Sequence, residues 1–239
     1  KGLTLYQSGR SREALTAFEE ATRIPNFYPA WVWKSSILSD FRKYDDALLA
    51  IKKAIEVAGG CKVTTAEEAG GCLTLYLQQG NVLRDLKRYQ EAIDSYSRAL
   101  ALNPDLAIAY NNRGATYKDL KQYDKALTDF NKAIVLNPGN EKAYYNRGAT
   151  YYGLKQYDKA LVDYNKAIAL YPDYVLAYNG RGLTYYGLKQ YDKALVDYNK
   201  AITLYPDFAR AYNGRGNIYS DLKQYDKALV DYNKAITLY

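Results

Sequence analysis

Histidine is absent from this sequence of 239 residues, and so is methionine. Histidine is the usual general base, the usual metal ligand and the usual switch of charge near neutral pH, so its absence argues against catalysis and against a metal site. No apolar run approaches the roughly 18 residues that a membrane-spanning helix needs, and no N-terminal signal segment is present. We therefore expect no enzyme, no cofactor and no membrane partner. The opening at Lys1 favours a piece of a longer protein.

Cysteine is nearly absent too, with Cys61 and Cys72 as the two examples. Two cysteines are too few for a scaffold built on disulfides or for a zinc site made of cysteines alone. The cysteine count does not determine the redox compartment, although it favours a reducing compartment such as the cytoplasm. Whether the two cysteines pair is also open at this point.

The net charge of +7 raises the question of nucleic-acid binding. However, the positive charge is spread thinly along the chain, with acidic residues interleaved and no dense basic block. This distribution is typical of a solvated surface of mixed charge, so we expect nucleic acid not to be a partner.

A repeat of 34 residues organises most of the chain. Prolines recur at this interval, as Pro104, Pro138, Pro172 and Pro206, and the segment Thr150–Ile168 recurs unchanged as Thr184–Ile202. A period of this length is typical of solenoids, in which one small supersecondary unit stacks on the next.

The spacing of apolar residues predicts two helices in each repeat, as residues 107–140 illustrate. Tyr110, Gly114 and Tyr117 share one helical face, and Lys121-Gln122 marks a break. The second half places apolar side chains at i, i+4 and i+7, from Ala126 through Phe130 to Ala133. Asn137-Pro138 ends the pair, because proline cannot continue a helix. The small residues let the helices approach closely, and the tyrosines are expected to fill the core.

The pattern Tyr110-x2-Arg113-Gly114-x2-Tyr117, followed by Ala126-x3-Phe130, Ala133 and Pro138, resembles the tetratricopeptide repeat. The resemblance implies an all-α fold, a right-handed superhelical solenoid of antiparallel helix pairs with the first helices on its concave side. One departure recurs: arginine stands where the family signature has leucine, at Arg113, Arg147, Arg181 and Arg215, and the partner of these arginines cannot be named from the sequence.

The phase of the repeat predicts the organisation of the chain. Residues 1–61 form degenerate N-terminal repeats, one partial and one full, and residues 73–239 form five regular repeats. Between them lies an insertion or linker at 62–72, which we expect to be a surface loop with a short helical turn at Thr65–Ala69. A disulfide or a regulated hinge is the alternative.

The resemblance also implies where a ligand binds, because the family lines its concave groove with the second, fifth, sixth, ninth, twelfth and thirteenth residues of each repeat. Carried over, these positions give twelve candidate groove residues: Asn111, Asn112, Lys118, Lys142, Tyr145, Asn146, Tyr152, Asn179, Tyr186, Arg210, Asn213 and Asn217. Asparagine prevails, and its amide can both donate to and accept from a peptide backbone.

We therefore expect a scaffold or sensor module that binds a protein or an extended peptide in this groove, as part of a larger protein. The alternative is a solenoid that self-associates head to tail through uncapped terminal repeats. On the opposite surface, Lys159, Asp163 and Lys166 are spaced as a solvated stripe of ion pairs, to which we assign no function.

Overall fold

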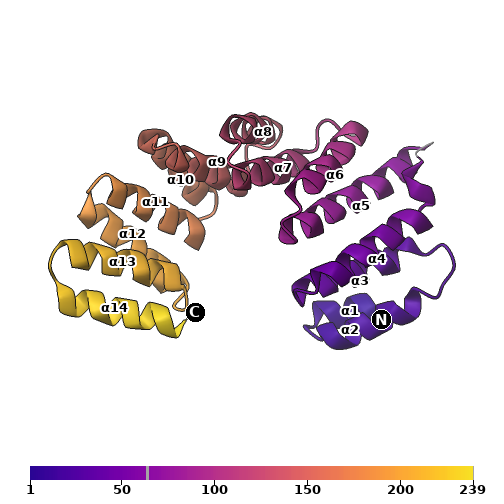
Figure 1. The fold of residues 1–239 in the computed structure, drawn as a ribbon, viewed down its shortest axis with the longest axis horizontal. Coiled ribbons are helices and arrows are strands. Elements are labelled where there is room, and N and C mark those ends of the chain that lie inside the picture. The colour runs from indigo at the N-terminus through magenta and orange to yellow at the C-terminus, as the bar shows by residue number, and fades with distance from the viewer. Residues whose placement is uncertain (63–64, 239) are drawn as a thin grey trace. The chain divides into compact units, whose positions relative to one another are not determined.

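The computed structural model describes residues 1–62 and 65–238. Every regular element in this part of the chain is a helix, so the predicted all-α class is confirmed (Figure 1). The chain divides into two compact units, Lys1–Gln122 (unit 1) and Tyr123–Tyr239 (unit 2), and each is described by itself.

Both units consist of helices joined by short turns. Unit 1 contains α1 (Gly2–Gln7), α2 (Ser11–Ala21), α3 (Tyr28–Asp40), α4 (Tyr44–Val57), the short 3-10 helix η1 (Gly59–Cys61), α5 (Ala66–Asp85), α6 (Tyr89–Leu102) and α7 (Ala107–Asp119). Unit 2 contains α8 (Tyr123–Leu136), α9 (Glu141–Gly153), α10 (Tyr157–Leu170), α11 (Val175–Gly187), α12 (Tyr191–Leu204), α13 (Ala209–Asp221) and α14 (Tyr225–Thr237).

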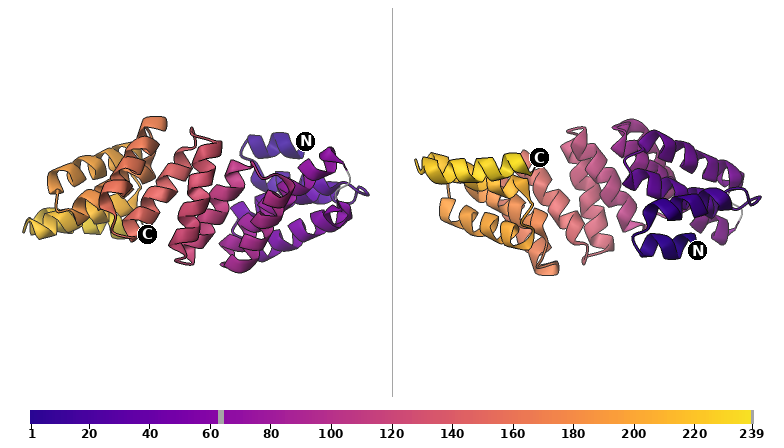
Figure 2. Two further views of the ribbon diagram at one scale, coloured as in Figure 1. Left: turned by 90° about the horizontal axis from the view of Figure 1, so that it is seen from above. Right: turned by 90° about the horizontal axis from the view of Figure 1, so that it is seen from below.

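The helices of each unit form two layers. Odd-numbered helices contact one another, α3 with α5 and α5 with α7 in unit 1, and α11 with both α9 and α13 in unit 2. Among the described residues of either unit, no even-numbered helix contacts another. Figure 2 shows the helices of each unit from two further directions. Because the odd-numbered helices lie closer together, they form the inner, concave layer of each unit, and the even-numbered helices form the outer layer.

A residue in the left-handed conformation ends each inner helix. Lys155 has φ of 57°, and the N–H of the next residue, Gln156, donates to the carbonyl of Tyr151 at 2.9 Å. This bond satisfies one of the carbonyls that the end of α9 leaves open. Lys121 has the same conformation, with φ of 59°, so the break predicted at Lys121-Gln122 is confirmed.

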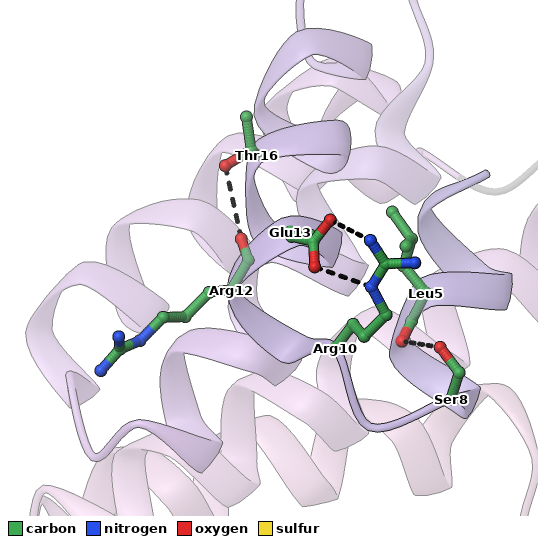
Figure 3. Close-up of polar contacts among 6 residues, drawn as sticks. All are labelled: Leu5, Ser8, Arg10, Arg12, Glu13 and Thr16. Atoms are coloured by element: carbon green, nitrogen blue, oxygen red, sulfur yellow. Dashed lines mark hydrogen bonds and ion pairs between the residues drawn. The ribbon is translucent and has the colours of Figure 1, made fainter.

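The first turn, between α1 and α2, adds side-chain contacts (Figure 3). Ser8 Oγ donates to the carbonyl of Leu5 at 2.9 Å, and Thr16 Oγ1 donates to the carbonyl of Arg12 at 3.3 Å. Arg10 holds Glu13 through both carboxylate oxygens, with Nε at 2.7 Å from Oε1. Both side chains of this pair are more than half exposed, so it contributes little to stability.

The predicted insertion is more ordered than a loop. Val63 and Thr64 lie outside the described residues, but 66–72 form the first turns of α5. Thr65 caps this helix, since its Oγ1 accepts from the N–H of Glu68 at 3.2 Å and its own N–H donates to the Glu68 carboxylate at 3.1 Å. A disulfide joins Cys61 to Cys72, with their Cα atoms 5.5 Å apart, and so ties η1 to α5.

The recurrent arginines bind aspartates of the outer helices. Arg147 of α9 donates from Nε and a terminal nitrogen to both oxygens of Asp163 on α10, at 2.8 and 2.7 Å, and from its other terminal nitrogen to Asn131 on α8 at 2.7 Å. The same arrangement recurs one and two repeats later, as Arg181 with Asp197 and Asn165, and as Arg215 with Asp231 and Asn199. Each arginine therefore links an inner helix to the outer helices before and after it.

This finding corrects the prediction of an ion-pair stripe on the outer surface. The Asp163 side chain is 2% exposed because it lies on the face of α10 that turns toward α9, so it pairs with Arg147 and not with the lysines of its own helix. Lys159 instead lies over the ring of Tyr151, 5.4 Å from its centre, and Lys166 has no ion pair in the described part of the chain.

Replacing one partner of an arginine–aspartate pair should destabilise unit 2. Burial raises the pKa of the Asp197 carboxyl by more than its hydrogen bonds from Arg181 lower it, so this carboxylate depends on its partner. We expect Arg181→Leu to lower the free energy of unfolding by about 3 kcal/mol in urea denaturation, because a buried charge is left unpaired. The double variant Arg181→Leu/Asp197→Leu should recover most of that loss.

Lys200→Ala, on the exposed face of the same outer helix, is the control and should change stability by less than about 0.5 kcal/mol. A loss from Arg181→Leu no larger than that of the control would show that the pair contributes nothing to the stack.

Candidate functional site

The twelve candidate groove residues all lie on inner helices. Asn111, Asn112 and Lys118 belong to α7 in unit 1, and the other nine belong to α9, α11 and α13 in unit 2. On α9, Ala143 and Thr150 are fully buried. Residues at the candidate positions, such as Lys142 and Tyr152, lie on the opposite side of the helix and are at least partly exposed. We call this surface of α9, α11 and α13 the inner surface of unit 2.

In unit 1 the asparagines of the inner helices bind one another. Asn111 is 8% exposed and donates to Asn112 at 3.2 Å, and Asn112 donates to Asn81 of α5 at 3.1 Å. Asn81 also accepts from the hydroxyl of Tyr96 at 2.8 Å. Much of the hydrogen-bonding capacity of these amides is therefore used inside the protein. Near them, burial lowers the pKa of Lys118.

In unit 2 two asparagines remain open. Asn179 of α11 is half-buried and Asn213 of α13 is exposed, and neither makes a hydrogen bond in the part of the chain that the structure describes. Asn217, farther along α13, differs because it accepts from the hydroxyl of Tyr232 at 2.9 Å. The inner surface of unit 2 thus presents two amides, one repeat apart, that can both donate and accept.

Tyrosines are the other main residues of the inner surface of unit 2. The ring of Tyr145 lies 6.0 Å from that of Tyr164 and 5.3 Å from that of Tyr174, centre to centre. Tyr152 and Tyr186 each pack against the first residue of an outer helix, Tyr157 or Tyr191, at 5.7 and 5.9 Å.

These tyrosines keep their protons at neutral pH. Burial, followed by the nearby carboxylate of Asp221, raises the pKa of Tyr186 to about 12. Burial likewise raises the pKa of Tyr145 and Tyr152. Their hydroxyls are therefore neutral donors and acceptors.

Two further tyrosines lie in the core, as the repeat pattern predicted, directly beneath this surface. Tyr164 and Tyr198 start on outer helices and pass between glycines of neighbouring inner helices. A Cβ added at Gly180 would lie 2.7 Å from the ring of Tyr164, and one at Gly214 would collide with the ring of Tyr198. The sequence held a signal for this arrangement, because the sixth residue of a repeat is asparagine at Asn112 and Asn146 but glycine at these two positions.

The chemistry of the inner surface of unit 2 is mostly neutral. Amides and phenols dominate it, with Lys142 and Arg210 exposed and Asp221 accepting a hydrogen bond from Tyr191 at 3.1 Å. Among the described residues, no group of His, Cys, Asp or Glu side chains could hold a metal ion. No helix in residues 1–62 and 65–238 combines the length and apolarity needed to cross a membrane.

The close approach of Tyr164 to α11 predicts opposite changes in stability for alanine at two glycine positions. Gly180→Ala should lower the free energy of unfolding by about 1–3 kcal/mol, because the added methyl group meets an aromatic ring that cannot retreat. Gly153→Ala should raise it by about 0.5–1 kcal/mol, since its nearest neighbour, the Tyr123 hydroxyl, is 3.7 Å away and alanine favours a helix. Urea denaturation of both variants measures this, and equal effects would contradict the packing described.

Comparison with known proteins shows what this architecture is similar to. Human anaphase-promoting complex subunit 7 (Homo sapiens) is 31% identical over 94 residues, which are 39% of this chain and 14% of that protein, so the chain spans a small part of that relative's length. A tetratricopeptide repeat protein from Parabacteroides merdae has a similar fold, with a TM-score of 0.79 and 23% identity over all of this chain and 90% of its own. YrrB, a TPR protein described as having an unusual peptide-binding site, has a TM-score of 0.54 and 24% identity, covering 82% of this chain and 95% of its own.

The repeats themselves match family models. The tetratricopeptide repeat model matches residues 107–140, 141–174, 175–208 and 209–239, and a TPR repeat model matches residues 80–121. Together the matches span 80–239, more than half of the chain. The chain belongs to the tetratricopeptide repeat family.

Proposed function

We propose that the protein is a non-catalytic scaffold whose inner surface of unit 2 binds an extended segment of a partner protein. The observation that carries this proposal is the pair of asparagines, Asn179 and Asn213, that the fold leaves without a hydrogen bond in the described residues. They recur at the same position of successive inner helices, so an extended chain that crosses these helices meets one amide per repeat.

The chemistry of the surface supports a polypeptide as the ligand. An extended segment carries donors and acceptors along its backbone, and an asparagine amide can satisfy one of each. A nucleic acid would need a positive groove, whereas the inner surface of unit 2 has few charges of either sign. The membership of YrrB, a peptide-binding TPR protein, in the same family agrees with this proposal.

The proposal can be tested with peptides selected from a random library against the whole chain. Asn179→Ala/Asn213→Ala should weaken the binding of selected peptides about tenfold or more, because two amides that bind the backbone are lost. Asn165→Ala is unsuitable as a control since Asn165 accepts from Arg181, so the control is Lys166→Ala on the outer layer. Calorimetric titration measures both, and equal affinity for the double variant and the control would reject the proposal.

Self-association is a second candidate function, favoured by the face of α14 that corresponds to the stacking face of α12. Leu229 and Ile236 are 58% and 71% exposed. Their equivalents one repeat earlier, Leu195 and Ile202, are partly buried in the cluster that joins α12 to α13. The face of α14 therefore has the composition of a stacking interface, and a second copy of the chain is the partner proposed for it.

Sedimentation over a wide range of concentration tests this second candidate. Self-association predicts a mass that rises with concentration and that Ile236→Glu returns to that of a monomer. Val196→Glu is the matched control, since Val196 is 67% exposed on the outer surface of α12 and should not affect the mass. A constant monomer mass for the unmodified chain would rule the candidate out.

The compartment expected from the cysteine count stays a prediction. The disulfide between Cys61 and Cys72 argues against it, because disulfides persist mainly in oxidising environments.

A further inference from the structure

Tyr164 and Tyr198 are the deepest residues of the inner surface of unit 2. Tyr164 is 2% exposed and Tyr198 is 1% exposed. Each ring is held between two inner helices. The ring of Tyr164 lies against Gly148 of α9 on one side, where an added Cβ would be 3.2 Å away, and against Gly180 of α11 on the other. Such packing leaves the ring one orientation, with its hydroxyl directed past the backbone of α11.

The hydroxyls of these two tyrosines lack the acceptor that their equivalents have. Tyr96 donates to Asn81 and Tyr232 donates to Asn217, at 2.8 and 2.9 Å, in each case to the ninth residue of the same repeat. In the repeats of Tyr164 and Tyr198 the ninth residue is Ala149 or Leu183, which offers no side-chain acceptor. Within the described residues neither hydroxyl makes a hydrogen bond.

These hydroxyls are nevertheless accessible from outside. Among the described residues, the buried side-chain polar atoms without a partner are Ser39 Oγ and Gln122 Oε1, and neither tyrosine oxygen is one of them. An oxygen without a partner that is not buried touches accessible space. Two donors, one repeat apart, are therefore offered to a ligand.

The other tyrosines converge on the same place. The ring of Tyr145 lies 6.0 Å from that of Tyr164. After burial, Tyr145, Tyr152 and Asp163 raise the pKa of Tyr164, and Tyr152, Tyr186 and Asp197 raise that of Tyr198, so Tyr152 lies near both hydroxyls. Burial raises the pKa of Tyr164 and Tyr198 well above the ordinary value, which keeps both hydroxyls protonated as donors. The result is a patch of partly exposed aromatic rings around two fixed donors, which we call the tyrosine patch (Tyr145, Tyr152, Tyr164, Tyr186 and Tyr198).

We infer that the tyrosine patch selects a proline-rich segment in the polyproline II conformation, an inference that rests on the proposed function and names its ligand. The backbone of such a segment makes no internal hydrogen bonds, so its carbonyls need donors from outside. Its proline rings are apolar and pack on aromatic faces, and its rigid conformation loses little entropy on binding. The tyrosine patch supplies donors and aromatic faces together.

A positively charged ligand fits the patch less well. Aromatic faces also attract cations, but Lys142 and Arg210 flank this surface, and the nearby carboxylate, Asp221, already accepts from Tyr191. A flexible proline-free segment would use the asparagines but would leave the aromatic faces of the tyrosine patch poorly covered.

The experiment compares two capped peptides of about twelve residues on the whole chain, one of polyproline and one of glycine and serine. The first is about 37 Å long as a polyproline II helix. We expect calorimetry to show binding of polyproline and none of the glycine–serine peptide. Tyr164→Phe/Tyr198→Phe should weaken polyproline binding about five- to thirtyfold, because two neutral hydrogen bonds are lost and the rings remain.

Two features keep the test interpretable. Phenylalanine already stands at this position of the repeat as Phe130, so the double variant should fold. Tyr185→Phe is the matched control, since the ring of Tyr185 lies beneath Lys193, 5.5 Å from its ammonium nitrogen, and should change affinity less than twofold.

Failure of this inference differs from failure of the proposed function. No binding of polyproline, or equal binding by the double phenylalanine variant and the wild type, overturns the inference. If library peptides still bind in a manner that depends on Asn179 and Asn213, the proposed function stands without it. Polyproline bound as tightly by Tyr152→Ala as by the wild type overturns it as well, because the ligand would then lie outside the tyrosine patch.

Discussion

The close crossing of the two helices in each pair is the constraint on which the rest of the structure depends. Ala143 of α9 and Ala160 of α10 are fully buried, and Gly148 leaves room for the ring of Tyr164. A larger residue at any of these positions would push the layers apart, since packed interiors do not yield to an added methyl group without strain. Because one pair cannot bury its apolar face alone, the same distance has to be kept in every repeat for neighbours to stack.

The arginine–aspartate pairs fix how the inner and outer helices are arranged in this stack. An apolar residue at the position of Arg181, such as the leucine of the family signature, would fill the same space without a fixed partner. Arg181 instead has three fixed contacts, two on Asp197 and one on Asn165, which belong to different outer helices. The desolvation of Asp197 offsets much of the attraction, so the pair need not increase stability. What it provides is geometry: the planar guanidinium accepts one arrangement of the two outer helices around each inner helix.

The sequence predicted the helix pairs and their breaks because those depend on neighbours along the chain. Spacing of apolar residues predicted the buried faces, and Lys121-Gln122 predicted a turn that the left-handed Lys121 makes. The partners of the arginines were not predictable, since a carboxylate 16 residues away is brought close by tertiary packing alone. Asp163 was misassigned for the same reason: helical spacing places it near Lys159 and Lys166, but it does not say which face turns inward. The repeat pattern predicted that the tyrosine rings fill the core. It did not predict the positions or the partners of their hydroxyls, because these depend on residues of other helices.

Near-identical repeats can still differ in function, because two positions of the inner helices decide whether a tyrosine hydroxyl is used within the protein. The ninth residue lies within reach of the outer-helix tyrosine hydroxyl of its own repeat at Asn81 and Asn217, and the sixth residue packs on the tyrosine ring of the preceding repeat at Gly180 and Gly214. Where the ninth residue is Asn81 or Asn217, the hydroxyl is used within the protein. Where it is Ala149 or Leu183, and glycine follows at the sixth position of the next repeat, the hydroxyl becomes available to a ligand. An apolar residue in place of asparagine at the ninth position, with glycine at the sixth position of the next repeat, therefore turns a core tyrosine into a donor for binding.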